Sequence, residues 1–154
     1  RISIHTDGDV VGALMAAIPG TGVDVLMGIG GTPEGVIAAA AVKALQGGMQ
    51  AIMAPQDEAE RDRIKAVMGG QLGQVLTLDD LIKSNDTFFA ATGITDGPFL
   101  EGIHYDRMGG VTTHSIVIRA LSGSIRYIKG VHQLMQDSSF SHVNVEEAVK
   151  IATQ

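Results

Sequence analysis

The sequence has 154 residues and contains no cysteine. This is the length of one ordinary domain, and the lack of cysteine excludes disulfide frameworks, thiol catalysis and thiolate metal sites. The net charge of −6 comes without any basic cluster, so we expect no nucleic-acid partner. The longest apolar run, residues 10–18, is too short to span a bilayer, so we expect no membrane partner either.

The first half of the sequence alternates strand-like and helix-like segments. The expected elements are a strand at 1–5, a buried helix at 10–18, a strand at 23–27, a helix at 36–45 ended by Gly47-Gly48, and a strand at 49–54. Thr32 is expected to cap the second helix. Pro33 would then take the first helical position, where its missing N–H costs nothing.

The second half has a different pattern. The expected elements are a surface helix at 57–68, a capping box at 77–80 that opens a short helix, a buried strand at 87–92, a hairpin of 112–121 and 124–132, and a helix at 145–152. Strand–helix alternation followed by a hairpin predicts an α/β fold. We expect a layered mixed sheet flanked by helices, with a C-terminal antiparallel hairpin.

Three turns rich in glycine and oxygen side chains each follow an expected strand: 7–9, 28–34 and 92–97. If these strands are parallel, the turns line one edge of the sheet, where α/β proteins bind ligands. Asp7 and Asp9 can accept hydrogen bonds from sugar hydroxyls or hold a cation. The Gly8 amide between them can bind a phosphate oxygen. Alternatively, Asp9 is only the N-cap of the next helix.

Residues 28–35, with the sequence GIGGTPEG, are the strongest local signal. The free amides at the start of a helix make an anion site, and Glu34 lies in that first turn. A carboxylate beside an anion site fits a hard cation, magnesium or manganese, lying between them. Alternatively, Glu34 only complements the helix dipole. A dinucleotide fingerprint matches poorly, because Pro33 occupies the third glycine position.

The remaining polar groups favour structural interpretations. Asp96 and Gly97 are typical turn residues. His114 has alternating neighbours, so we expect it on a strand, hydrogen-bonded across the sheet. The other histidines lack metal-ligand spacing, and no Gly-x-Ser-x-Gly turn of a serine hydrolase occurs.

Several segments together resemble the class II fructose-1,6-bisphosphatases of bacteria. They are Asp7-Gly8-Asp9, 26–42 (LMGIGGTPEGVIAAAAV), Gly47-Gly48-Met49-Gln50, 88–97 (FFAATGITDG), 109–119 (GGVTTHSIVIR), Ser122-Gly123 and Arg126. The similarity runs from about residue 6 to residue 132. On this basis, residues 1–132 are expected to be the C-terminal α/β half of such an enzyme, and residues 133–154 a variable tail.

The resemblance implies metal-dependent hydrolysis of the 1-phosphate of fructose 1,6-bisphosphate, a cytoplasmic step of gluconeogenesis that uses Mn²⁺ or Mg²⁺. Some members also take sedoheptulose 1,7-bisphosphate. The implied fold is that of the lithium-sensitive sugar and inositol phosphatases. By position, Asp7, Gly8 and Asp9 match the substrate-binding triplet of the family, Gly31 a substrate-contacting glycine and Glu34 a metal-binding glutamate.

Family members are about twice as long, and their other metal-binding acids lie upstream of the point where this sequence starts. The sequence begins on Arg1 inside an expected strand, so we expect a missing N-terminal half, in the same protein or in another chain. Alone, these residues are expected to bind metal poorly and not to turn over. A homo-oligomer is also expected. The alternatives are a non-catalytic α/β module that binds a phosphate-bearing small molecule or nucleotide through residues 28–35, and a structural domain.

Overall fold

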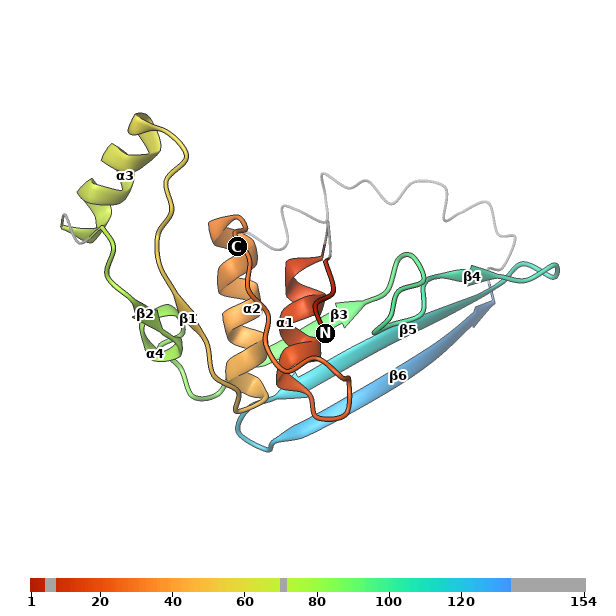
Figure 1. Ribbon diagram of the computed structural model, residues 1–154. Helices are drawn as coiled ribbons and strands as arrows, with labels where there is room; N and C mark the ends of the chain where they lie inside the picture. Colours follow the sequence, from red (N-terminus) through yellow and green to blue (C-terminus); the bar gives the residue numbers. More distant parts are fainter. Residues whose placement is uncertain (5–7, 70–71, 134–154) are drawn as a thin grey trace, which may run out of the picture.

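The computed structural model describes residues 1–4, 8–69 and 72–133. Its elements follow the chain in the order α1 (Asp9–Ala17), α2 (Thr32–Ala44), β1 (Gln50–Ala51), α3 (Glu58–Met68), β2 (Leu76–Thr77), α4 (Leu78–Leu81), β3 (Phe88–Thr92), β4 (His104–Tyr105), β5 (Gly110–Arg119) and β6 (Ser124–Gln133) (Figure 1). The expected α/β class, with helices flanking a sheet and an antiparallel hairpin, is confirmed. Among the described residues, no helix is long and apolar enough to cross a membrane.

A four-stranded antiparallel sheet is built around β5. This strand pairs with β3 and β4 along one edge and with β6 along the other. The predicted hairpin is therefore confirmed as β5–β6, in register from Gly110 opposite Gln133 to Arg119 opposite Ser124. Gly123 closes its turn with a φ of 58°, a left-handed conformation that favours glycine.

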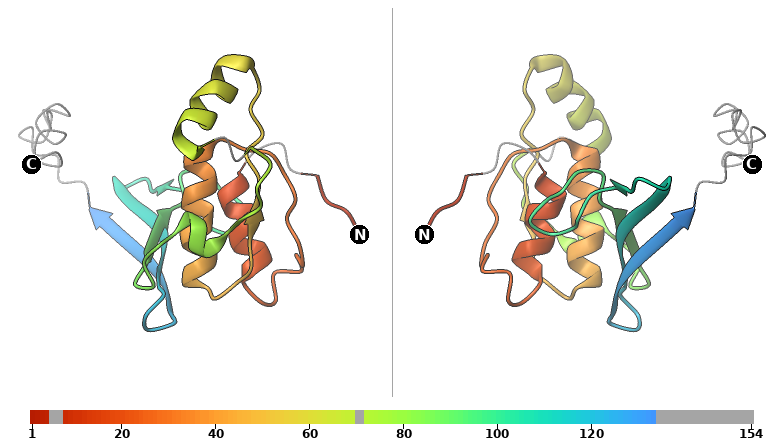
Figure 2. Two further views of the ribbon diagram at one scale, coloured as in Figure 1. Left: turned by 90° about the vertical axis from the view of Figure 1, so that its left-hand side faces the viewer. Right: turned by 90° about the vertical axis from the view of Figure 1, so that its right-hand side faces the viewer.

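Helices α1 and α2 lie side by side on one face of this sheet (Figure 2). Strand side chains alternate between faces, so every second residue of β5 points at the helices. The buried core between the layers consists of Leu14, Ala41, Ala44, Phe89, Ile116 and Ile118. The small alanines of α2 let its backbone approach the sheet closely.

Two expected strands do not form in the described structure. Residues 1–4 and 23–31 have no regular structure, and the strand expected at 49–54 is reduced to β1, which pairs with β2 in a separate two-stranded sheet. Every strand pair in the described residues is antiparallel, and none of these pairs includes residues 23–27. The apolar pattern of a strand is present there, but a strand requires a partner for its backbone groups.

Helix starts agree more closely with prediction. Helix α3 begins as expected, because the Asp57 carboxylate accepts a 2.7 Å hydrogen bond from the Glu60 N–H. The capping box at α4 is also confirmed, since the Asp80 carboxylate accepts a hydrogen bond from the backbone N–H of Thr77 at 2.9 Å. Helix α2 starts one residue early, with Gly31 as N-cap and Thr32 as its first residue. The helix predicted at 145–152 lies outside the described residues.

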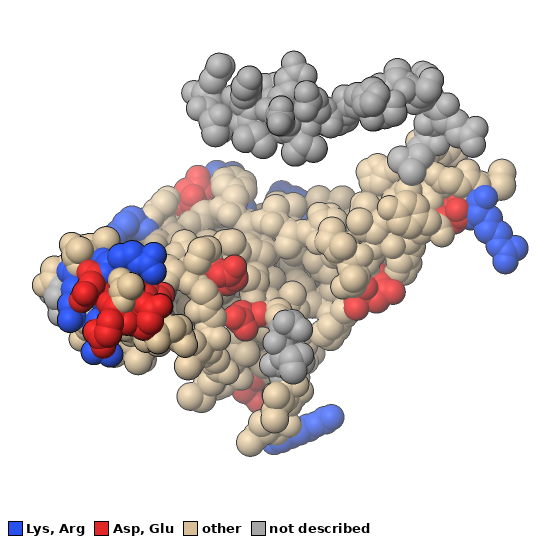
Figure 3. Space-filling model, turned by 90° about the horizontal axis from the view of Figure 1, so that it is seen from above, with Lys and Arg blue, Asp and Glu red and all other residues tan. Residues whose placement is uncertain are grey.

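Charged side chains gather mainly at one end of the molecule. Lys and Arg are interspersed with Asp and Glu over α3, whereas the middle of the same face carries few charges (Figure 3). In α3, Arg61 pairs with Glu58 and Lys65 with Asp62, so the charges partly offset one another. This mixed surface is that of a solvated helix rather than of a patch of a single sign.

Candidate functional site

The N-terminal ends of α1 and α2 form the candidate site. The two helices run in the same direction in contact with each other, and both begin at the upper end in Figure 1. Neither helix has a side-chain hydrogen bond at its N-cap. The first-turn N–H groups of a helix have no partner within it, and the helix dipole adds positive character there. Two sets of amide donors therefore face the same region.

The N-cap of α1 is Gly8, and Asp9 is the first residue of the helix. The alternative in which Asp9 is the cap is therefore wrong. Gly8 has a φ of 89°, which few residues other than glycine adopt without strain. Its lack of a side chain also leaves its amide open to a ligand. Asp7, the first residue of the predicted triplet, lies outside the described residues.

Two adjacent glycines bring the two acidic side chains together. A Cβ atom on Gly30 would collide with the Asp9 carboxylate, and a Cβ atom on Gly31 would collide with the Glu34 carboxylate. Each carboxylate therefore lies against loop backbone that only glycine leaves free. One region thus contains four of the predicted residues: Gly8, Asp9, Gly31 and Glu34. Two helix starts bring them together, rather than the ends of parallel strands as expected.

This region combines amide donors with carboxylate acceptors. Amides at helix starts suit phosphate oxygens, and carboxylates suit sugar hydroxyls or cations. The described residues contain no group of three or more His, Asp or Glu side chains arranged to hold a metal ion. An ion bound by Glu34 would therefore need ligands from outside these residues, because hard cations take six or more oxygens.

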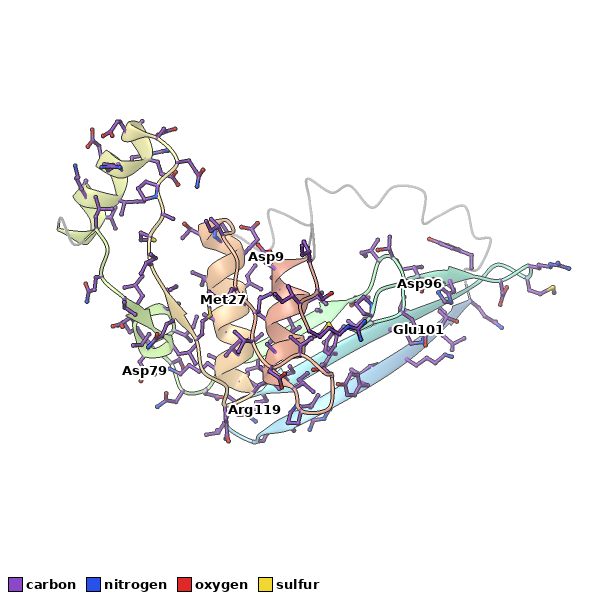
Figure 4. All side chains as sticks on the ribbon, viewed as in Figure 1. Asp9, Met27, Asp79, Asp96, Glu101 and Arg119 are labelled. Carbon is purple, nitrogen blue, oxygen red and sulfur yellow. The ribbon has the colours of Figure 1, made fainter. Side chains whose placement is uncertain are left out.

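The third predicted turn does not join this region. Asp96 lies well away from Asp9 along the sheet (Figure 4). Its Oδ1 accepts hydrogen bonds from the Gly102 N–H at 2.8 Å and from His104 Nε2 at 2.7 Å. The Gly102 bond, followed by the one from His104, lowers the pKa of Asp96 below its ordinary value. Asp96 therefore closes the loop between β3 and β4, which matches its interpretation as a turn residue.

His114 makes a different contact from the one expected. Its Nε2 lies 3.5 Å from Glu101 Oε2, on the same loop, and its Nδ1 is buried without a partner in the described residues. The bond between side chains of β5 and β6 comes instead from His132, whose Nε2 is 3.2 Å from Thr113 Oγ1. Nothing in the local sequence pattern pointed to Glu101, because its approach to β5 depends on the path of the whole loop.

Comparison with known proteins gives consistent results. The family model of bacterial, glpX-encoded fructose-1,6-bisphosphatase matches residues 1–132. A class 2 fructose-1,6-bisphosphatase of Haemophilus influenzae is 40% identical over 152 residues, covering 90% of this chain and 44% of the relative. Fructose-1,6-bisphosphatase 1 class 2 of Escherichia coli K12 is 42% identical over 148 residues, covering 87% of this chain and 43% of the relative. The chain thus spans less than half the length of these relatives.

Proposed function

Because this chain belongs to the bacterial fructose-1,6-bisphosphatase family, we propose that the whole protein hydrolyses the 1-phosphate of fructose 1,6-bisphosphate. This chain would supply the substrate-binding part of the site. The observation that supports this role is the placement of the Asp9 and Glu34 carboxylates against Gly30 and Gly31, beside two uncapped helix starts.

The residues of the chain would divide the sugar bisphosphate between them. The amides at the starts of α1 and α2 would donate hydrogen bonds to phosphate oxygens. Asp9 would accept hydrogen bonds from sugar hydroxyls, as would Asp7 by its position in the family triplet. Gly8 and Gly31 would let the substrate approach the backbone closely. Together these contacts hold the phosphate ester in a fixed orientation.

Glu34 would provide one carboxylate ligand to Mg²⁺ or Mn²⁺. Such an ion, when bound, neutralises phosphate charge and lowers the pKa of a bound water. The remaining ligands and the group that orients the water would come from residues outside this chain's described part, so these residues alone would not turn over. Sedoheptulose 1,7-bisphosphate as a further substrate, a cytoplasmic role in gluconeogenesis and a homo-oligomer belong to the same proposal.

A Glu34→Gln substitution in the full-length enzyme tests the proposal. The amide keeps the shape of the side chain but removes the charge that a divalent cation needs. We expect phosphate release from fructose 1,6-bisphosphate to fall at least about 100-fold at fixed metal concentration, with partial recovery at higher metal. Phosphate release is measured in a coupled colorimetric assay across a manganese titration.

Glu58→Gln, on the solvated face of α3, is the matched control and should leave turnover unchanged. Near-normal turnover of Glu34→Gln would exclude Glu34 as a metal ligand. Micromolar binding of ATP or NAD to the chain without metal, measured by calorimetry, would favour the alternative of a nucleotide-binding module.

A further inference from the structure

A hollow of about 230 Å³ lies beside the loop between β3 and β4, away from the candidate site. It is lined by Phe99, Leu100, Glu101, His114, Ser115, Tyr127, Ile128 and Lys129. Phe99 and Leu100 pack against the core that the helices share with the sheet, so the loop lies on the helix-bearing face. Glu101 and Asp9 are well separated in Figure 4, so this hollow is distinct from the region around Gly30 and Gly31.

The floor of the hollow is the β5–β6 hairpin. The register places Lys129 directly opposite His114, and Tyr127 directly opposite Ile116. Residues two apart on a strand share a face, so these side chains point to the side of the sheet that carries the loop. The floor thus presents an ammonium group and a phenol beside aliphatic surface.

The wall of the hollow is held in place by its own hydrogen bonds. The Gly97 N–H donates to the Leu100 carbonyl at 3.0 Å, and the Ile103 N–H donates to the Ile94 carbonyl at 3.1 Å. The exposed Asp96 carboxylate adds its hydrogen bond from the Gly102 N–H. A wall fixed in this way needs little ordering when a ligand binds, which lowers the entropic cost of binding.

The charged side chains of the hollow are Glu101 and Lys129. Glu101 Oε2 lies 3.5 Å from His114 Nε2. Lys129 makes no ion pair or side-chain hydrogen bond with any described residue. One free cation therefore faces a surface that is apolar on the loop side, next to a carboxylate that disfavours a second negative charge.

We propose that this hollow binds a small monocarboxylate with a compact apolar body. The carboxylate would pair with Lys129 and accept a hydrogen bond from the Tyr127 hydroxyl. The apolar body would contact Phe99 and Leu100. A phosphate dianion fits less well, because its second charge would meet Glu101 without a second cation to offset it. The volume lies below the about 300–1,000 Å³ of pockets that hold drug-sized ligands, which favours a small ligand over a nucleotide.

Benzoate is the probe. It is titrated into the 154-residue chain while the backbone amide signals are followed by NMR. We expect saturable shifts confined to residues 99–101 and 127–129. Lys129→Met, which keeps the length of the stem and removes the charge, should weaken benzoate binding about 10-fold. Lys65→Met on α3 is the matched control and should leave it unchanged. Lys129 is exposed, so the variant is expected to fold, and its circular dichroism spectrum verifies this.

Benzylamine and inorganic phosphate are titrated in parallel. Benzylamine should give no saturable shifts in these residues, and phosphate should bind more weakly than benzoate. The proposal is overturned if benzoate does not saturate at tens of millimolar, if Lys129→Met binds it as well as the unmodified chain, or if phosphate binds more tightly. The readout is binding rather than turnover, so the result is independent of the phosphatase proposal.

Discussion

Asp9 and Glu34 each occupy the space that a side chain on a neighbouring loop glycine would need. Gly30 has no positive φ, so its backbone does not require glycine. The requirement comes from the carboxylate of Asp9 instead. Gly28 in the same loop has open space around the position of a Cβ atom, which makes the two glycines a matched pair. In this glycine-rich loop, the contact with Asp9 therefore requires glycine at position 30, whereas no contact requires it at position 28.

Gly30→Ala in the full-length enzyme should displace the Asp9 carboxylate. We expect kcat/KM for fructose 1,6-bisphosphate to fall about 10-fold or more, equivalent to about 1.4 kcal/mol of lost transition-state binding. The free energy of unfolding should change by less than about 1 kcal/mol, because an exposed carboxylate can turn away. Steady-state kinetics and urea unfolding measure the two effects. Gly28→Ala should change neither, and an equal loss of activity in both variants would contradict a specific role for the Asp9 contact.

At the scale of single elements, one carboxylate holds the loop between β3 and β4 in addition to the backbone hydrogen bonds of the loop. Asp96 bonds Gly102 and His104 at once, and a Cβ atom on Gly102 would collide with the loop backbone near Thr95. Residues 93–103 can therefore follow this closed path because Gly102 leaves room for the neighbouring loop backbone and Asp96 hydrogen-bonds to Gly102 and His104. This loop also carries Phe99, Leu100 and Glu101 into their positions above β5.

The loop should therefore loosen in acid. The folded state lowers the pKa of Asp96, so the charged form is favoured by folding. Its contribution to stability is complete above the unfolded pKa of about 3.9 and is lost as the pH falls through the lower folded value. In NMR spectra recorded from pH 6 to pH 2, the Gly102 amide should lose its hydrogen-bonded shift only below pH 4.

Asp96→Asn tests the same link through stability. Urea unfolding should show the variant to be less stable at neutral pH, with the difference shrinking toward zero as the pH approaches 2. Asp24→Asn, at an exposed position without a hydrogen bond in the described residues, is the control and should show no pH-dependent difference. A pH-independent difference for Asp96→Asn would show that the charge of Asp96 does not hold the loop.

Elements whose stabilising contacts are local could be predicted from the sequence. Helix α3 has its cap at Asp57, and β5–β6 is a hairpin whose turn glycine and alternation lie within one short stretch. Residues 23–27 have an equally clear strand pattern, but strand formation depends on a neighbour that the pattern does not contain. The same distinction explains why pairing of β1 with β2 could not be foreseen.

The candidate site shows a similar division. Gly8, Asp9 and Glu34 could be chosen from the sequence because amides at a helix start bind anions and carboxylates bind hydroxyls or cations. Gly31 was singled out by the resemblance to the family. Their grouping was expected from parallel strands and instead follows from the packing of α1 against α2. The contact between Glu101 and His114 could not be predicted, because it depends on how the loop crosses β5.

At the scale of the whole molecule, apolar side chains are exposed along an irregular segment. Val25, Met27 and Ile29 are 71%, 89% and 78% exposed, whereas Leu26 between them packs near Gly12 of α1. A segment that is apolar on both sides is typical of a strand buried between two layers. Since the chain spans less than half the length of its relatives, we infer that further segments of the full-length protein cover these side chains.

Met27→Glu should have different effects on stability in the 154-residue chain and in the full-length protein. In the 154-residue chain the side chain is already in water, so the free energy of unfolding should change by less than about 0.5 kcal/mol. In the full-length protein the new carboxylate would be buried without a partner, which should cost more than about 2 kcal/mol and lower the melting temperature by several degrees. Val67→Glu, at an exposed position of α3 among charged residues, should be nearly neutral in both. Equal, small effects of Met27→Glu in the two proteins would show that this apolar segment stays exposed in the complete enzyme.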